Sequence, residues 1–184
     1  MKITRHYLTI NGRRVHYRRA GKGPPLLMVH QSPRSSSEYE PLMQEWGAHF
    51  TCIAPDLPGF GHSEPLGIAN LTIEDIADSL MAFVDALGIG PFVLVGHSLG
   101  ALMAAAFAAR HPHQVQRLVL LSPAAGYGLA TAAQREEKLQ ARLALMQRLG
   151  PQGLAAERSG SLLSPAAGAE ARALVRWNMA QLDA

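Results

Sequence analysis

Two spacings of apolar residues alternate along the chain, and together they predict strands that alternate with helices. Residues 2–20 alternate apolar and polar positions around Asn11-Gly12, a pair that favours a type I′ turn, so this segment predicts a β-hairpin. Short continuous apolar runs predict four further strands, each covered on both faces, at residues 26–29, 50–54, 92–95 and 115–121.

Segments of helical spacing or composition separate these strands. The clearest follows Thr72, which forms a capping-box-like pair with Asp75, and its apolar residues recur at helical intervals until Gly88. Residues 35–46 have helical composition, and a further helix is expected over about 101–110. Strands that alternate with helices predict the α/β class, with a mostly parallel sheet and helices on both of its faces.

The last third of the chain has a different pattern. A charged amphipathic helix is expected over residues 130–149, and Gly150-Pro151 breaks it. A loop is expected over 159–165 and a final helix over 170–182, with no strand pattern among them. The predicted domains are therefore an α/β core and a helical segment, over residues 1–125 and 126–184.

Composition excludes several classes of function. The 184 residues are 48% hydrophobic, which is enough to bury a sizeable core. The net charge is only +3, and no aromatic residues interleave with a basic stripe, so nucleic-acid binding is not expected. The first residues lack the apolar region of a signal peptide, and the longest apolar run, 101–109, is too short to span a bilayer. We therefore expect a cytoplasmic protein that does not bind membranes.

The cysteine and histidine content predicts no metal or disulfide chemistry. Cys52 is the single cysteine, which excludes an intrachain disulfide, and its apolar strand predicts a buried thiol. His111 and His113 form the one close histidine pair in the sequence, but no acidic residue lies near them. No metal ion and no cofactor is expected.

The segment Gly96-His97-Ser98-Leu99-Gly100 lies between a predicted buried strand and a predicted helix. Its two glycines, Gly96 and Gly100, lack the Cβ atoms that would clash where the strand turns into the helix, so the serine between them is raised above the sheet edge. The start of the helix supplies free N–H groups and a positive dipole where an oxyanion would form. This pattern predicts Ser98 as a nucleophile, against the alternative of an ordinary helix-capping serine.

Three motifs in this order resemble the α/β-hydrolase superfamily, in its branch of small esterases, lactonases and C–C hydrolases. They are His30-Gln31-Ser32-Pro33, where the family has His-Gly-x-Pro, the loop Asp56-Leu57-Pro58-Gly59-Phe60-Gly61-His62-Ser63, and the G-x-S-x-G segment 96–100. The resemblance is close over residues 1–125. It is looser over 126–184, which is similar to a cap domain.

The resemblance implies roles for residues around Ser98. Leu99 is expected to donate one oxyanion N–H and Ser32 the second. Gln31 replaces the family's glycine, so it either contributes its side-chain amide to the site or changes the course of the loop. His30 is expected to shape this loop through hydrogen bonds, and His97 to pack beside the sheet.

The second motif is expected to have a structural role. Asp56 and Ser63 would tie down their own loop through bonds from side chain to backbone, and Gly59 and Gly61 would allow its tight turns. His62 is expected to be a solvated loop residue.

The acid and the base of a catalytic triad are missing from the sequence. The family order is Ser, then Asp or Glu, then His, and after Ser98 only His111 and His113 remain, roughly 20 Å away along the helix. Some members place the acid after the sixth strand, where this chain has Ser122-Pro123. The later acids follow no predicted strand: Glu136, Glu137, Glu157, Glu170 and Asp183.

We therefore expect these residues to be the N-terminal two-thirds of a longer hydrolase, poorly stable and nearly inactive alone. A sheet that ends at the 115–121 strand would also leave an exposed apolar edge.

The leading functional hypothesis is a cofactor-independent serine hydrolase that acts on a small ester or lactone through an acyl-enzyme on Ser98. The serine argues against the dehalogenases and epoxide hydrolases of the family, which attack through aspartate. C–C hydrolases, prolyl aminopeptidases and haloperoxidases share the G-x-S-x-G pattern and remain alternatives. The alternative from another class is a non-catalytic relative that acts as a binding module. The expected partner is a small-molecule substrate, and the sequence predicts no oligomeric state.

Overall fold

The computed structural model describes residues 1–124 and 126–180, which form two compact units, Met1–Ala124 and Ala125–Ala184. The first unit holds every strand of the described chain, and the second is helical. Within the described residues no helix has the length and apolar content that a membrane crossing needs. The α/β class predicted from the sequence is confirmed.

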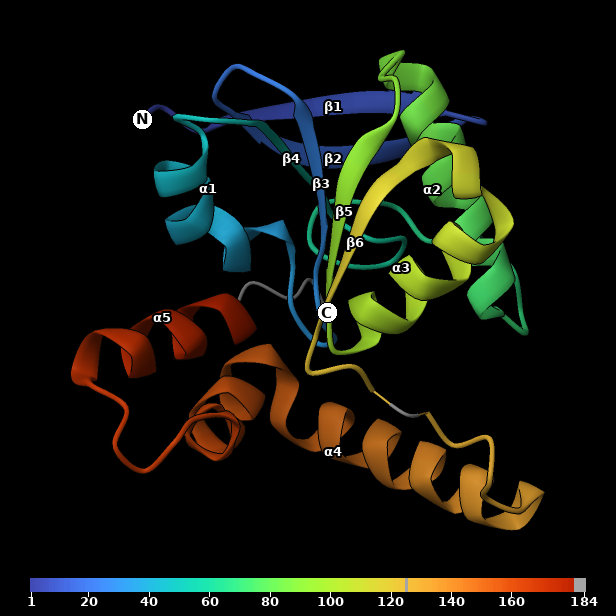
Figure 1. Cartoon of the computed structure of the whole chain (residues 1–184). Coiled ribbons are helices and arrows are strands. Elements are labelled where there is room, and N and C mark those ends of the chain that lie inside the picture. Colours follow the sequence, from blue (N-terminus) through green and yellow to red (C-terminus); the bar gives the residue numbers. More distant parts are fainter. Residues whose placement is uncertain (125, 181–184) are drawn as a thin grey trace. The chain divides into compact units, whose positions relative to one another are not determined.

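A six-stranded sheet with the strand order β1-β2-β4-β3-β5-β6 forms the centre of the first unit (Figure 1). The first two strands are an antiparallel hairpin, and β2 pairs antiparallel with β4, while the remaining neighbours are parallel. Asn11 and Gly12 both have positive φ, at 50° and 76°, as a type I′ turn requires. The strands are β1 (Thr4–Ile10), β2 (Arg13–Ala20), β3 (Pro25–Val29), β4 (Thr51–Pro55), β5 (Phe92–His97) and β6 (Val115–Leu121).

Helices cover both faces of this sheet. Helix α1 (Glu40–Trp46) lies on one face, and α2 (Ile73–Leu87) and α3 (Leu99–Arg110) lie on the other (Figure 1). Strand β3 alternates between two cores, because Leu27 and Val29 pack with α2 and α3 residues while Leu26 and Met28 pack on the α1 side. Both faces of the strand are buried, which explains its continuous apolar run.

The helices begin and end where local chemistry dictates. Helix α2 has a complete capping box, with Thr72 and Asp75 bonded reciprocally, and Gly88 ends it at φ 61°. The segment expected as one helix over 35–46 is instead the 3-10 helix η1 (Ser36–Tyr39) followed by α1. A proline in the first turn of α1 lacks the N–H that a continuous helix would use, so the two helices are separate. A short 3-10 helix, η2 (Pro112–Gln114), precedes β6.

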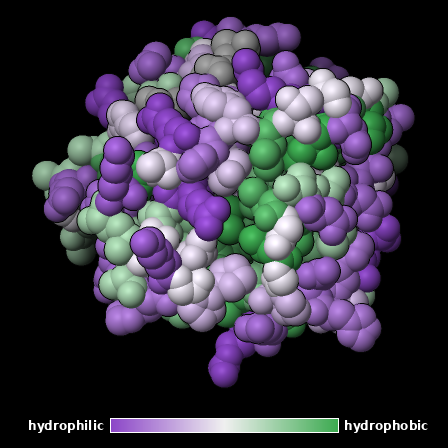
Figure 2. All heavy atoms as spheres, turned by 90° about the horizontal axis from the view of Figure 1, so that it is seen from above, coloured by the Kyte–Doolittle hydropathy of each residue, from purple (hydrophilic) through white to green (hydrophobic). Residues whose placement is uncertain are grey.

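Strand β6 is an exposed edge. Among the described strands it pairs with β5 alone, and its residues Leu118, Val119, Leu120 and Leu121 are 39–41% exposed. This confirms the expected apolar edge. Seen from above in Figure 2, the surface is mostly hydrophilic, and hydrophobic residues gather most strongly towards the centre and right of the view.

The second unit contains α4 (Ala132–Arg158), the 3-10 helix η3 (Ser159–Leu162) and α5 (Ala169–Met179). The predicted break is confirmed, because Gly150 has non-helical angles (φ 60°, ψ −179°) before Pro151, and helical structure then resumes to Arg158. Residues 181 and 182 of the predicted final helix lie outside the described residues. The unit has its own small core of four buried residues, Leu154, Ala155, Val175 and Met179.

A buried carboxylate joins three segments of the first unit. Asp56, at the end of β4, is 1% exposed, and its Oδ2 lies 2.7 Å from Nδ1 of His16 on β2. The same oxygen accepts the N–H of His62, and Oδ1 accepts the N–H of Ser36 in η1. Ser63 Oγ accepts the N–H of His16. Asp56 and Ser63 therefore tie the 56–63 loop not only to itself but also to β2 and η1.

These contacts set the ionisation of Asp56. Burial by itself raises the pKa of this carboxyl, but hydrogen bonds from His16, Ser36 and His62 outweigh it and hold the pKa well below the ordinary value of 3.8. A carboxyl with a lowered pKa in the folded state stabilises the fold above its ordinary pKa. That stabilisation is lost as the pH falls through the ordinary pKa towards the folded one.

We predict that Asp56→Asn lowers the free energy of unfolding by roughly 3 kcal/mol at pH 7, because it leaves buried donors without their charged acceptor. The difference between the variant and the wild type should shrink below pH 4. Urea unfolding at pH 7 and pH 3 measures both effects. Asp78→Asn is the control, since Asp78 is 55% exposed in its pair with Arg110 and its loss should cost less than about 1 kcal/mol. Equal losses for the two variants would contradict the role of Asp56.

Candidate active site

Ser98 lies at the turn between β5 and α3, in a backbone conformation that serine rarely adopts. Its angles are φ 54° and ψ −112°, and it is the N-cap residue of α3. Residues other than glycine reach positive φ only at a cost, on the order of 1–3 kcal/mol. Backbone bonds hold the conformation: the N–H of Ser98 donates to Leu121 O at 2.9 Å, and its carbonyl accepts the N–H of Ala124 at 3.2 Å.

The two glycines of the turn are required by close packing. A Cβ on Gly96 would collide with the carbonyl of Gly100 and with Ala101 Cα. A Cβ on Gly100 would collide with the carbonyls of Val29 and His30. The first turn of α3 therefore lies directly against the end of β3, and this contact brings the loop after β3 to the nucleophile turn.

Hydrogen bonds within the loop after β3 determine its course. His30 is fully buried, and its Nε2 accepts the N–H of Leu57, so the proton lies on Nδ1, which donates to Gln31 O at 2.8 Å. The φ angle of Gln31 is not positive, so this position needs no glycine. With its amide oriented to satisfy both atoms, the Gln31 side chain accepts from the Arg34 guanidinium at 2.8–3.1 Å. The side-chain oxygen of Gln31 is thereby engaged by Arg34, whereas the sequence left open whether this amide serves the site or the loop changes its course.

The backbone amides of this loop differ in their availability. The N–H of Gln31 donates to Glu38 Oε1 at 3.2 Å, and the N–H of Arg34 donates to Gln31 O at 3.1 Å. Pro33 has no N–H. Within residues 1–124, no hydrogen bond engages the N–H of Ser32, and none engages that of Leu99 at the start of α3.

His97 and His62 are both partly buried, and His62 lies in less open surroundings than the sequence indicated. His97 is 30% exposed at its side chain, and its Nδ1 lies 3.4 Å from Glu38 Oε1. The ring of His62 is half-buried, with its centroid 5.1 Å from that of His16 in an edge-on arrangement. His62 is therefore not the solvated residue that was expected.

Two polar residues of this region, Glu38 and His16, were not predicted from the sequence. Glu38 is a buried carboxylate that contacts both the 30–33 loop and His97, and the i, i+4 spacing of Arg34 and Glu38 was the available signal. His16 was missed because a single histidine in an alternating strand has no distinguishing pattern.

Within the described residues no hydrogen bond joins Ser98 Oγ to a histidine, although His97, the residue before it, is paired with Glu38. His111 follows the last residue of the twelve-residue helix α3, about 18 Å from its start. The nitrogens of His30 are both engaged, and His16 is bound to Asp56. Glu136, Glu137, Glu157 and Glu170 lie in helices of the second unit, and Asp183 lies outside the described residues.

Groups that bind metals are likewise not assembled in the described part of the chain. It contains no cluster of three His, Cys, Asp or Glu residues suited to a metal ion.

Cys52 is fully buried, as predicted, and burial raises the pKa of its thiol to about 11.

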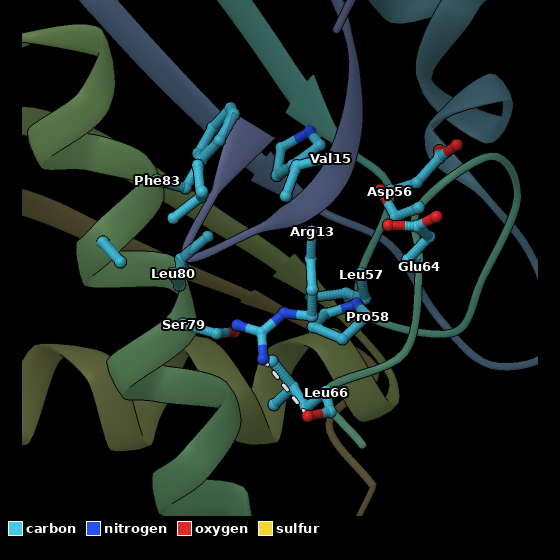
Figure 3. Close-up of a pocket in the computed structure, with 14 residues that line it drawn as sticks. Arg13, Val15, Asp56, Leu57, Pro58, Glu64, Leu66, Ser79, Leu80 and Phe83 are labelled. Carbon is cyan, nitrogen blue, oxygen red and sulfur yellow. Dashed lines mark hydrogen bonds between the residues drawn. The ribbon is translucent and has the colours of Figure 1, made fainter. Parts of the chain in front are cut away.

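A cavity lies apart from Ser98, between the β1–β2 hairpin, α2 and the loop after β4 (Figure 3). The cavity is small and partly open to solvent, and Arg13 crosses it to donate to Leu66 O at 3.1 Å. No residue of the 96–100 turn or of the 30–33 loop contributes to its lining. The lining residues are Ile10, Arg13, Val15, Pro55, Asp56, Leu57, Pro58, Ser63, Glu64, Leu66, Ser79, Leu80, Ala82 and Phe83.

Comparison with known proteins finds relatives that are named as hydrolases and one that is named as a decarboxylase. The chain is 31% identical over 137 residues to the (E)-2-((N-methylformamido)methylene)succinate hydrolase of Acinetobacter baylyi, a match that covers 74% of this chain and 51% of that protein. It is 35% identical over 128 residues to the cis-3-alkyl-4-alkyloxetan-2-one decarboxylase of Shewanella oneidensis, covering 68% and 40%. The matched region thus spans about half the length of these curated relatives.

A solved structure of an esterase has a similar fold. A thermophilic esterase from Thermogutta terrifontis, determined with malate bound, superposes with a TM-score of 0.79 at 26% identity. The superposition covers 96% of this chain and 66% of the esterase. The family model described as alpha/beta hydrolase fold matches residues 24–171, which include the 30–33 loop, the 56–63 loop and the 96–100 turn. The chain belongs to the alpha/beta hydrolase fold family.

Proposed function

We propose that this chain carries the nucleophile and the oxyanion site of a cofactor-independent serine hydrolase that acts on small esters or lactones. The observation that carries the proposal is the pair of unengaged amides beside Ser98. One is the N–H of Leu99 at the positive end of α3, and the other is the N–H of Ser32. Among the amides of the 30–33 loop, Ser32 is left by elimination, because its neighbours are bonded or are proline.

The proposed reaction proceeds through a covalent intermediate. Ser98 Oγ attacks the substrate carbonyl, and the resulting oxyanion accepts hydrogen bonds from Leu99 and Ser32. The carbon–oxygen bond to the alcohol then breaks, the alcohol takes up a proton, and an acyl-enzyme remains on Ser98. Water hydrolyses this ester to release the acid. Each proton transfer requires a histidine and an orienting carboxylate. Within the described residues no histidine is hydrogen-bonded to Ser98 Oγ.

The comparisons support the substrate class. The Shewanella oneidensis relative is named for an oxetan-2-one, which is a four-membered lactone, and the Thermogutta terrifontis structure is an esterase. A serine at position 98 favours ester and lactone chemistry over the epoxide and haloalkane chemistry of members that attack through aspartate. C–C hydrolases use the same elbow and are the nearest enzymatic alternative.

A second candidate is a non-catalytic relative that binds a small molecule without turnover. The observation that favours it is that no histidine is hydrogen-bonded to Ser98 Oγ in the described part of the chain. Labelling by a fluorophosphonate discriminates the two candidates, since only an activated serine hydroxyl reacts readily with this probe.

We predict that an open reading frame that continues past codon 184 encodes an acid after a strand and then a histidine.

The product of this reading frame should hydrolyse p-nitrophenyl acetate, and Ser98→Ala should lower its kcat by about 10⁴-fold or more, because the nucleophile is removed. The 184-residue chain alone should show almost no turnover. Sequencing of the coding DNA and a spectrophotometric assay measure these outcomes, with Ser79→Ala as the matched serine control. A Ser98→Ala protein with the wild-type rate would contradict the proposal.

We further predict that Gly100→Ala, although it adds only one methyl group, destabilises the fold and slows the reaction of Ser98. The added Cβ overlaps the carbonyls of Val29 and His30, so it should cost about 1–3 kcal/mol of unfolding free energy and slow fluorophosphonate labelling of Ser98. Gly90→Ala is the control, because Gly90 is exposed and its Cβ would meet open space. Chemical denaturation and mass-spectrometric labelling compare the two variants, and equal behaviour would argue against close packing at Gly100.

A further inference from the structure

Glu38 is a buried carboxylate next to the nucleophile turn, and the proposed reaction does not use it. Its side chain is 4% exposed. Oε1 accepts the N–H of Gln31 at 3.2 Å and lies 3.4 Å from Nδ1 of His97. Oε2 has no hydrogen-bond partner among the described residues, and Arg34 Nη1 lies 3.6 Å from it. One side chain thus contacts both the loop after β3 and the residue that precedes Ser98.

Two consecutive peptide groups of the loop are oriented by these contacts. The peptide between His30 and Gln31 is held because its N–H donates to Glu38. The next peptide, between Gln31 and Ser32, is held by its carbonyl, which accepts from His30 Nδ1 and from the N–H of Arg34. This peptide is trans, so its N–H points opposite to its carbonyl. The amide of Ser32 is therefore turned away from both donors and left available.

The charges around Glu38 allow a carboxylate to lie near an oxyanion site. Arg34 faces it from the same segment; burial lowers the pKa of this guanidinium, while the charge of Glu38 raises it. Burial and then Glu38 raise the pKa of Tyr39 well above its ordinary value, so the phenol stays neutral. Arg34 balances the negative charge of Glu38. Glu38 in turn holds the loop through the hydrogen bond that it accepts from the N–H of Gln31.

We propose that Glu38 is a positioning residue that holds the 30–33 loop so that the N–H of Ser32 faces the oxyanion. Its effect on catalysis rests on the proposed function, whereas its hold on the Gln31 amide does not. A residue that merely stabilised the fold would change unfolding without changing this amide or the reaction of Ser98.

The first test is amide hydrogen exchange of Gln31 by NMR in the 184-residue chain. Glu38→Ala removes the acceptor, so exchange at Gln31 should rise at least about tenfold, whereas Glu38→Gln keeps an acceptor oxygen and should change it less than about threefold. Glu40→Gln is the matched control, since Glu40 lies two residues away and accepts from Arg18 instead. Glu38→Leu, which fills the space without an acceptor, replaces Glu38→Ala if that variant fails to fold.

The second test is the reaction of Ser98 in the product of the full open reading frame, followed as kcat and KM and as the rate of fluorophosphonate labelling. Glu38→Ala should lower kcat by about 10- to 100-fold with KM changed less than about threefold, and Glu38→Gln should recover most of the rate.

The outcomes separate this proposal from the proposed function. Unchanged exchange at Gln31 in Glu38→Ala overturns the role of Glu38, whatever Ser98 does. Faster exchange with an unchanged kcat overturns its importance for the oxyanion site. Exchange that responds as expected in a protein whose wild-type Ser98 never reacts refutes the hydrolase proposal and leaves the positioning of the loop intact.

Discussion

The approach of α3 to the end of β3 is the constraint on which the site depends. Gly100 has no room for a Cβ because the carbonyls of Val29 and His30 occupy that space. The contact places the start of a helix, with its unsatisfied amides and positive dipole, beside a loop that offers one more free amide. Neither element would form an oxyanion site by itself. The distance between the start of α3 and the loop after β3 is set by a contact between backbone atoms. Such a contact adjusts much less than a contact between side chains does.

Two buried carboxylates then hold the loops that this packing brings together. Asp56 joins the 56–63 loop to β2 and η1, and Glu38 joins the 30–33 loop to the residue before Ser98. A buried charge is costly unless hydrogen bonds surround it, so each acid selects one loop geometry and disfavours the others. The two networks meet in η1, which provides the amide of Ser36 to Asp56 and the side chain of Glu38 to Gln31. This short helix therefore couples the two loops.

The fold could be predicted from the sequence wherever a pattern is periodic or a turn has its own chemistry. The hairpin at Asn11-Gly12, the capping box at Thr72 and the break at Gly150 all depend on residues within a few positions of one another. The contacts of the site were harder to predict, because the hydrogen-bond partners of Asp56 lie 40 and 20 residues earlier in the chain. The two alternatives for Gln31 could not be decided from the sequence for a similar reason. The backbone angle there is ordinary, and a distant carboxylate does the orienting.

The conformation of Ser98 depends on the least protected strand of the sheet. Its N–H donates to Leu121 at the end of β6, and its carbonyl accepts from Ala124 just beyond. The apolar residues of β6 are about 40% exposed, and β6 is paired on one side only among the described strands. An edge strand with half its ladder unpaired opens more readily than a central one. When β6 opens, Ser98 loses two of the bonds that hold its positive φ, so its strained conformation is no longer maintained. The geometry of the nucleophile is therefore tied to how well this edge is covered.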